Sequence, residues 1–216
     1  MRRPQLSVYS IGFLALFAII SVLVVSGTTR LWDNQALLAV ATLRDPARTR
    51  IMRWLSDLGN WQWEVPLAFG IAMALGLRSK RNAARRFLAI GVSGELLYAA
   101  SKFLFHRPRP TIIPHLGQAG WYSYPSGHAM LAVILWGYGL AELATIVDWR
   151  GGKMVMWLLA VVLPCAIASS RVYLGVHYPS DVLGALCLGV AWVLLWSAPP
   201  SESPSQLETS AAPSIK

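Results

Sequence analysis

The sequence VYSIGFLALFAIISVLVV, residues 8–25, is an uninterrupted stretch without a single charged side chain. An α-helix needs about 20 mostly apolar residues to cross the hydrocarbon core of a bilayer. Two arginines at positions 2–3 precede the stretch and Val-Ser-Gly ends it, as in a secretory signal peptide. Its apolar core is longer than the roughly 7–15 residues of a signal peptide. We therefore expect a helix that stays in the membrane.

Further apolar segments follow along the 216-residue chain. The chain is 55% hydrophobic and only 13% charged, whereas a soluble domain carries about 25% charged residues. We predict an all-α fold, a bundle of six transmembrane helices that forms a single membrane-embedded domain over residues 1–197. The expected helices cover approximately residues 8–25, 63–78, 87–105, 127–147, 153–169 and 181–197.

The segments between and after these helices have their own character. Residues 26–63 include the amphipathic sequence LLAVATLRDPARTRIMRWLSDLG, which predicts short helices that lie on the outer membrane surface. Residues 198–216 are rich in Pro and Ser with no apolar periodicity, so we expect a disordered tail. Cys165 and Cys187 lie within apolar segments and are interpreted as buried, inert thiols.

The positive charges predict the orientation. Lys and Arg gather at residues 2–3, 78–86 and 149–153, and cytoplasmic loops carry an excess of these residues. The connection 26–63 also carries five arginines, which weakens this argument. We predict a multi-pass protein of the inner or plasma membrane with both termini in the cytoplasm. The net charge of +9 then indicates anionic lipid headgroups rather than nucleic acid as partner.

This topology brings three polar clusters to the outer face. They are KFLFHRPRP (102–110), YPSGH (124–128) and SRVYLGVHYPSD (170–181). Lys102, Arg109 and Arg171 are cations with few acids nearby, and a partly desolvated cation needs an anion. The planar fork of arginine suits phosphate oxygens. The clusters therefore predict a phosphate site.

The remaining residues of these clusters suggest the chemistry. Pro-Ser-Gly before His128 marks a helix start, where free backbone N–H groups favour an anion. Of His128 and His177, one can attack phosphorus while the other protonates the departing oxygen. Asp181, four residues after His177, can accept a hydrogen bond from one imidazole nitrogen and leave the other unprotonated. Taken singly, each feature has a structural explanation, such as a snorkelling cation, a helix cap or a structural His–Asp pair.

The three clusters together resemble the signature of the type 2 phosphatidic acid phosphatase superfamily, the integral-membrane lipid phosphate phosphatases. The residues that carry the resemblance are Lys102-x6-Arg109-Pro110, Pro125-Ser126-Gly127-His128 and Ser170-Arg171-x5-His177-x3-Asp181. The resemblance extends over the six-helix layout, including SDLGN before the second helix.

The resemblance implies a role for each residue. Lys102, Arg109 and Arg171 would hold the phosphate, aided by the backbone at Ser126 and Gly127. His177 would be the nucleophile and form a phosphohistidine, Asp181 would orient it, and His128 would protonate the leaving group. No metal or other cofactor would be needed.

Three other polar residues, His106, His115 and Glu95, are not assigned to the phosphate site. The outer face has no cluster of carboxylates such as a two-metal site requires, and His106 and His115 are assigned no role. Glu95 lies on the same helix face as Lys102, seven residues earlier. An intramembrane carboxylate is a functional hypothesis by default, but we interpret Glu95 as a structural partner for a neighbouring helix.

The leading hypothesis is a phosphatase that releases inorganic phosphate from a lipid mono- or diphosphate at the outer face. The substrate would be of the undecaprenyl diphosphate, phosphatidylglycerol phosphate or phosphatidic acid class, with a lipid A phosphate also open, and no obligate protein partner is expected. One alternative is a phosphatase of a soluble ester or a vanadate-binding, haloperoxidase-like site. The short connection from Arg109 to Pro125 leaves little room for a cap over a soluble pocket. The other alternative is a non-catalytic lipid-phosphate binder.

Overall fold

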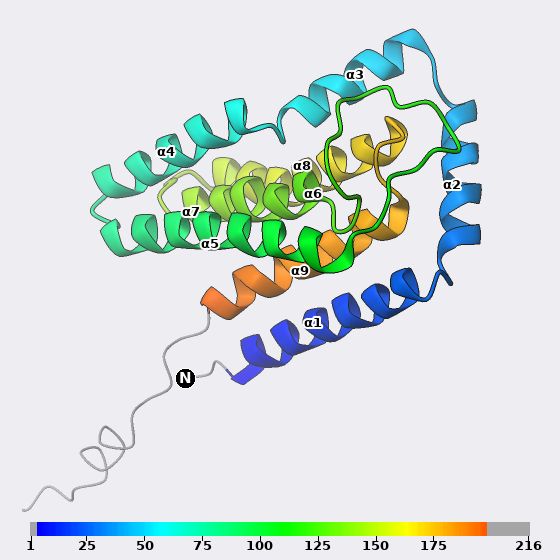
Figure 1. Ribbon diagram of the computed structural model, residues 1–216. Coiled ribbons are helices and arrows are strands. Elements are labelled where there is room, and N and C mark those ends of the chain that lie inside the picture. The colour runs from blue at the N-terminus through cyan, green and yellow to red at the C-terminus, as the bar shows by residue number, and fades with distance from the viewer. Residues whose placement is uncertain (1–3, 198–216) are drawn as a thin grey trace, which may run out of the picture.

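The protein folds into a bundle of helices (Figure 1). The structure, a computed structural model, describes residues 4–197. Within this range the chain forms helices joined by turns and irregular loops, and no β-strand occurs. The long helices are α1 (Pro4–Val25), α4 (Trp61–Leu77), α5 (Arg81–Phe105), α8 (Arg150–Tyr173) and α9 (Pro179–Ser197). The all-α prediction is confirmed. The expected disordered tail, residues 198–216, lies outside the described residues.

Within residues 4–197, five helical stretches are long and apolar enough to cross a membrane. They are Val8–Val25, Arg81–Phe105, Gly127–Ala144, Arg150–Tyr173 and Pro179–Ser197. The sixth predicted span, α4, has only 17 residues, or about 25 Å at 1.5 Å per residue, against a hydrocarbon core of about 30 Å. Trp61 and Trp63 in its first turn are exposed, and such aromatic side chains anchor short spans in the interface.

The central span, Gly127–Ala144, is the most buried of the five. It divides into α6 (Gly127–Leu131), a π-helical segment η1 (Ala132–Tyr138) and α7 (Gly139–Ala144). The fully buried side chains of Met130 and Ile134 from this span, with Phe87 from α5, form part of the main core cluster. The apolar pattern of the sequence predicted a helix here but not its π-helical turn.

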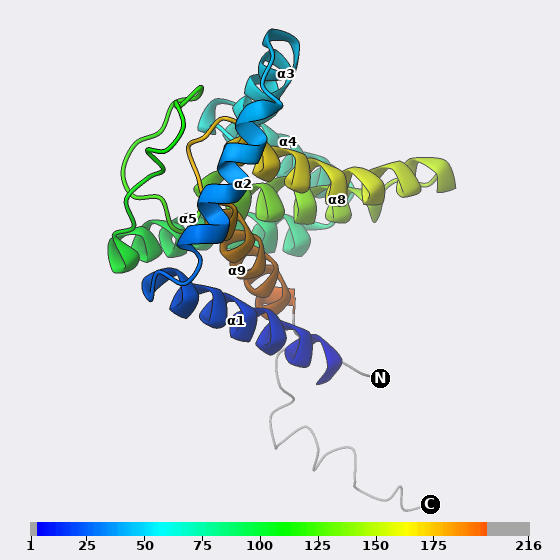
Figure 2. The same cartoon turned by 90° about the vertical axis from the view of Figure 1, so that its right-hand side faces the viewer.

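Helix α1 lies along α9, as Figures 1 and 2 both show. The ring of Phe17 on α1 stacks on Tyr124 with 6.0 Å between centroids. The Ser21 hydroxyl lies 2.8 Å from the Tyr124 hydroxyl. Tyr124 in turn packs against Gly184 of α9, where a Cβ would lie only 2.4 Å from the Tyr124 hydroxyl oxygen. Tyr124 therefore connects the first and last helices just before the start of α6.

Two short helices, α2 (Arg30–Thr42) and α3 (Pro46–Asp57), lie at one end of the bundle, and the sequence predicted short helices in this connection (Figure 1). Pro46 occupies the first turn of α3, and Asp45 caps it by accepting a hydrogen bond from the Arg48 amide at 2.9 Å. Arg44 donates to the Tyr173 carbonyl oxygen at 2.9 Å, which ties the α2–α3 turn to the end of α8.

The connection from α5 to α6, residues 106–126, contains no helix and folds over the same end of the bundle (Figure 1). The Leu116 amide donates to the Leu174 carbonyl oxygen at 2.8 Å. Arg53 of α3 donates to the Leu116 carbonyl oxygen at 3.0 Å. These contacts fix the loop beside the ends of α3 and α8.

The two thiols differ from the expectation of burial. Cys165 is exposed on α8 and Cys187 is only partly buried. The prediction is wrong for Cys165 because an apolar segment in a membrane helix includes positions that face lipid as well as positions that face the core.

Candidate active site

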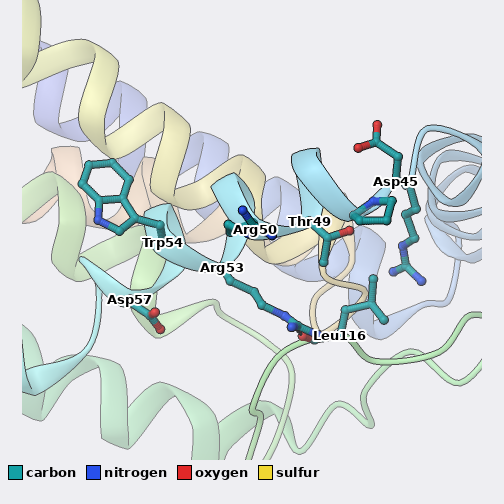
Figure 3. Close-up of a pocket in the computed structure, with 9 residues that line it drawn as sticks. Asp45, Thr49, Arg50, Arg53, Trp54, Asp57 and Leu116 are labelled. Carbon is teal, nitrogen blue, oxygen red and sulfur yellow. Dashed lines mark hydrogen bonds between the residues drawn. The ribbon is translucent and has the colours of Figure 1, made fainter.

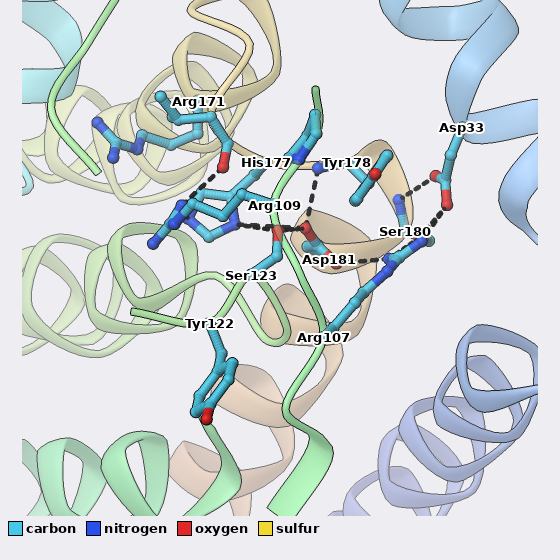
Figure 4. A network of polar contacts seen from close by, with 12 residues as sticks. Asp33, Arg107, Arg109, Tyr122, Ser123, Arg171, His177, Tyr178, Ser180 and Asp181 are labelled. Carbon is cyan, nitrogen blue, oxygen red and sulfur yellow. Dashed lines mark hydrogen bonds and ion pairs between the residues drawn. The ribbon is translucent and has the colours of Figure 1, made fainter. Parts of the chain in front are cut away.

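The three polar clusters of the sequence meet where α8 ends and α9 begins. Figure 4 shows Arg109, Arg171, His177 and Asp181 around this connection. The contributing elements are the last turn of α5 (Lys102), the α5–α6 loop (Arg109), the start of α6 (Ser126, Gly127 and His128), the last turn of α8 (Arg171) and the α8–α9 connection with the first turn of α9 (His177 and Asp181).

His177 is buried between an arginine and an aspartate. Its Nε2 lies 3.1 Å from Arg109 Nη1, and its Nδ1 lies 3.4 Å from Asp181 Oδ2. Because a guanidinium group only donates, Nε2 is the acceptor and the proton of the neutral ring sits on Nδ1. Burial, and then the charges of Arg109 and Arg171, lower the pKa of His177 well below its ordinary value. The ring is therefore neutral at pH 7, with the lone pair of Nε2 directed toward the cations.

Asp181 is fully buried in the first turn of α9. Its Oδ2 accepts from the Tyr178 amide at 2.9 Å and from the Ser123 hydroxyl. The position at a helix N-terminus also favours a negative charge. These contacts fix the carboxylate that faces His177 Nδ1. Ser123, in the α5–α6 loop, was not singled out by the sequence.

Arg107 is a second residue that the sequence did not single out. It donates to Asp181 Oδ1 at 2.5 Å and to Asp33 Oδ2 at 2.7 Å, and it lies over the Tyr178 ring at 4.1 Å (Figure 4). Asp33, on α2, also accepts from the Ser180 amide at 3.0 Å. The two carboxylates balance the charge of Arg107, which therefore supports Asp181 from behind.

The cation cluster, Lys102, Arg109 and Arg171, is held differently. Arg109 donates to the carbonyl oxygens of Val176 and Gly120, each at 2.6 Å. Arg171 donates to the Gln118 carbonyl oxygen at 3.0 Å and to the Ser56 hydroxyl. Lys102 donates to the Tyr122 carbonyl oxygen.

No carboxylate in residues 4–197 lies within salt-bridge distance of these three cations. Neutral acceptors orient them but do not cancel their charge. The arrangement suits a multiply charged anion such as phosphate.

The start of α6 differs in one detail from the expectation. The Ser126 amide donates to the Asp181 carbonyl oxygen at 3.2 Å, so this amide is already engaged, whereas the Ser126 hydroxyl is buried without a partner. A Cβ on Gly127 would lie 2.5 Å from Tyr98 Cζ. Only glycine therefore fits between the first turn of α6 and the Tyr98 ring.

His128 is oriented by the turn before α4. Its Nε2 lies 3.0 Å from Asn60 Oδ1, and Asn60 Nδ2 donates to Asp57 Oδ1 at 3.1 Å. The second contact fixes the orientation of the Asn60 amide, so His128 Nε2 is the donor. A Cβ on Gly59 would lie 2.8 Å from His128 Cδ2. Gly59 and Asn60 of the sequence SDLGN therefore position the His128 ring.

Among the described residues, the side chains of His106 and His115 form no hydrogen bond with a predicted site residue, although His115 lines a hollow of about 620 Å³ together with Arg171. His106 ends α5 with its ring 4.5 Å from that of Tyr122, and His115 contacts the Pro110 carbonyl oxygen at 2.6 Å. In the described part of the chain, no group of three or more His, Cys, Asp or Glu residues is arranged to hold a metal ion. Glu95 forms no hydrogen bond or ion pair with a neighbouring helix among the same residues, contrary to our structural interpretation.

Beside His128, a groove of about 630 Å³ runs between α4, α5 and α6, and we call it the α4–α5 groove. Leu131 and Leu135 line it, together with Phe69 and Val92, which are exposed at the surface of the bundle. In a membrane, such exposed apolar side chains face acyl chains. The groove therefore connects the neighbourhood of His128 with the lipid phase.

A second hollow of similar size lies over α3, lined by Arg50, Arg53, Trp54 and Asp57 (Figure 3). None of the predicted site residues lines it. Arg53 is already used to hold the α5–α6 loop. This hollow is distinct from the candidate active site.

Comparison with known proteins gives a consistent result. A family model described as the PAP2 superfamily matches residues 83–202. Phosphatidylglycerophosphatase B of Bacillus subtilis (strain 168) is 27% identical over 177 residues, which cover 81% of this chain and 86% of the relative. The putative undecaprenyl-diphosphatase YbjG of Escherichia coli (strain K12) is 32% identical over 143 residues, 62% of this chain and 67% of the relative.

Two solved structures share the fold. The transmembrane PAP2-type phosphatidylglycerolphosphate phosphatase from Bacillus subtilis matches with a TM-score of 0.80 at 23% identity, over 95% of this chain and 98% of that structure. LpxE of Aquifex aeolicus matches with a TM-score of 0.58 at 21% identity, over 76% of this chain and 93% of that structure.

Proposed function

The chain belongs to the PAP2 superfamily and is a membrane lipid phosphate phosphatase, and we propose that it works through a phosphohistidine at His177. The observation that carries this proposal is the unprotonated Nε2 of His177, 3.1 Å from Arg109 Nη1. A phosphate bound by the cation cluster would lie next to this lone pair. The nucleophile and the charge that stabilises the transition state are then in one place.

The reaction would proceed in two displacements. In the first, the Nε2 lone pair forms a bond to phosphorus, and the phosphorus–oxygen bond to the lipid breaks with its electron pair moving to oxygen. That oxygen takes a proton from the imidazolium form of His128, which becomes neutral. In the second, water attacks phosphorus and gives a proton to His128, the N–P bond returns its electron pair to Nε2, and inorganic phosphate leaves. Asp181 stabilises the positive charge that the His177 ring carries while Nε2 is bonded to phosphorus.

His128 is suited to this role by its position. It lines the α4–α5 groove, and Arg171, His177 and Arg109 are its electrostatic neighbours. We infer that the lipid chains occupy the groove while the phosphate occupies the cation cluster. The apolar lining also favours a lipid over a soluble phosphate ester.

The test is a phosphate-release assay on purified protein in detergent micelles. The substrates are phosphatidylglycerol phosphate, phosphatidic acid, undecaprenyl diphosphate, lipid A phosphate and a short-chain soluble phosphate ester. We expect turnover of at least one long-chain lipid, inhibition by vanadate, and no loss of activity with EDTA because the cation cluster supplies the positive charge. Turnover of the soluble ester alone would contradict the proposal.

We also propose that the site faces the periplasm or cell exterior, with both termini in the cytoplasm. Gln118, in the α5–α6 loop, is a suitable reporter because only its backbone carbonyl is used by Arg171. In a variant lacking Cys165 and Cys187, a Gln118→Cys thiol should react with an impermeant maleimide in intact cells. Reaction only after permeabilisation would reverse the orientation.

A further inference from the structure

The α4–α5 groove contains two carboxyl groups in an otherwise mainly apolar lining. They belong to Glu64 on α4 and Glu95 on α5, and we call them the carboxyl pair. Glu64 is only 6% exposed, and its Oε1 is buried without a hydrogen-bond partner. Glu95 is also without a hydrogen bond or ion pair among the described residues. The mechanism above uses neither residue.

A buried polar atom without a partner destabilises the folded protein. Such a group in a ligand groove is satisfied when the ligand brings a hydrogen-bond donor. A hydroxyl group is a suitable donor for a carboxyl oxygen. A fully ionised phosphate is not, because it has no hydrogen to donate to that oxygen and would be repelled by an ionised carboxylate.

Tyr98 lies between the carboxyl pair and the cation cluster. It lies on α5 between Glu95 and Lys102, and the Lys102 ammonium lies 5.2 Å from the centre of its ring. The electrostatic neighbours of its hydroxyl include both members of the carboxyl pair as well as Arg109 and Arg171. Glu95 and Lys102 are seven residues apart, about 10 Å along the helix axis.

We propose that the carboxyl pair is a subsite for the headgroup of the leaving alcohol, and that it selects a phosphate monoester whose headgroup bears a free hydroxyl, such as glycerol. This rests on the proposed function, because it assumes that the phosphate occupies the cation cluster and the lipid the groove. The headgroup then lies between them, beside Tyr98, within reach of the two carboxyl groups. A polyprenyl diphosphate is disfavoured because its leaving group is itself a phosphate.

The first test uses the wild-type protein and two matched substrates. One is phosphatidylglycerol phosphate, and the other is its analogue without the free hydroxyl of the glycerol headgroup. A site that hydrogen-bonds a substrate hydroxyl discriminates strongly against the analogue that lacks it. We expect kcat/KM for the hydroxylated substrate to be higher by about 10-fold or more. Equal kcat/KM values for the two substrates would overturn the proposal, and this comparison needs no protein variant.

The second test uses Glu64→Met and Glu95→Met, which remove the polar atoms but keep side-chain length. We expect each to lower kcat/KM for phosphatidylglycerol phosphate while leaving the deoxy analogue unchanged, so that the preference disappears. The control is Asp148→Asn, which removes an exposed carboxylate near Arg78, and it should retain the preference. An equal loss on both substrates would show that the pair is structural. Failure of the proposed function is distinguishable, since the wild type would then release no phosphate from any lipid.

Discussion

The cation cluster and the carboxyl pair lie near each other but have opposite character. Neutral carbonyl and hydroxyl oxygens hold Lys102, Arg109 and Arg171, and no cation lies within salt-bridge distance of Glu64 or Glu95 in the described chain. The protein therefore keeps the cation cluster without a carboxylate partner and the carboxyl pair without a cationic partner. Each region remains available for a different part of the substrate.

Arg107, only two residues from Arg109, is instead paired with carboxylates. It pairs with Asp33 and Asp181 and is nearly buried. A paired arginine positions its neighbours, whereas an arginine that contacts only neutral acceptors can bind an anion.

Replacement of the nucleophile should have the largest effect. We expect His177→Ala to lower kcat by roughly 10⁴-fold or more, because loss of a covalent nucleophile removes the two-step route. The measurement is phosphate release from the best lipid substrate. His115→Gln, which can keep a donor to the Pro110 carbonyl, is the control and should be near normal. Substantial turnover by His177→Ala would refute the assignment.

Arg171→Lys keeps the positive charge but loses the planar fork. We expect kcat/KM to fall by about 10²-fold, comparable to the loss of one donor to a developing oxyanion. Arg78→Lys at the opposite end of the bundle, where Arg78 lies 3.5 Å from exposed Asp148, should be close to wild type. A near-normal Arg171→Lys enzyme would mean that Arg171 acts only as a point charge.

Gly59→Ala tests the position of His128. The new Cβ would lie 2.8 Å from His128 Cδ2 and displace the ring, and we expect a loss of about 10-fold or more because misplacement of a catalytic group is costly. A substrate with a good leaving group, which needs no proton from His128, should recover part of the rate.

The matched control for this change is Gly70→Ala on α4, where a Cβ would have nothing within 4 Å. It should leave activity unchanged. If Gly59→Ala and Gly70→Ala behave alike, or if the activated substrate recovers nothing, His128 is not the proton donor.

The smallest expected effect is a shift in the pH dependence of kcat/KM. Burial, followed by Arg109, lowers the pKa of His177, and the neutral ring is the nucleophile. Activity should therefore persist below the ordinary pKa of histidine and fall as the ring becomes protonated. Arg109→Gln removes a positive charge that opposes protonation, so the acidic limb of kcat/KM should move to higher pH. An acidic limb that moves to lower pH would contradict this account.

The sequence predicted the helices and the signature residues for different physical reasons. Apolar segments such as residues 8–25 must be buried or face lipid, so their helices are visible in the chain itself. The catalytic assignments came from the family resemblance that three spaced clusters of residues carry. Those assignments remain predictions until the variants are measured.

Other features depend on contacts between distant elements, which periodicity does not reveal. Asp33 lies in an amphipathic segment where an acid is ordinary, and its pairing with Arg107 arises only when α2 crosses the start of α9. The contact between Asn60 and His128 similarly requires the turn before α4 to meet the start of α6. The sequence analysis singled out Glu95 as an intramembrane acid. It did not single out Glu64, the other carboxyl group of the groove, because Glu64 lies in a short segment beside interfacial tryptophans.

The most direct test of the central claim is to trap the intermediate. Wild-type protein and His177→Ala are mixed with a lipid substrate radiolabelled in its terminal phosphate, quenched within one turnover and analysed for protein-bound label. We predict a phosphoprotein in the wild type that is labile to acid and stable to base, with the label on His177, and none in His177→Ala. Label that remains in His177→Ala would contradict a phosphohistidine at this position.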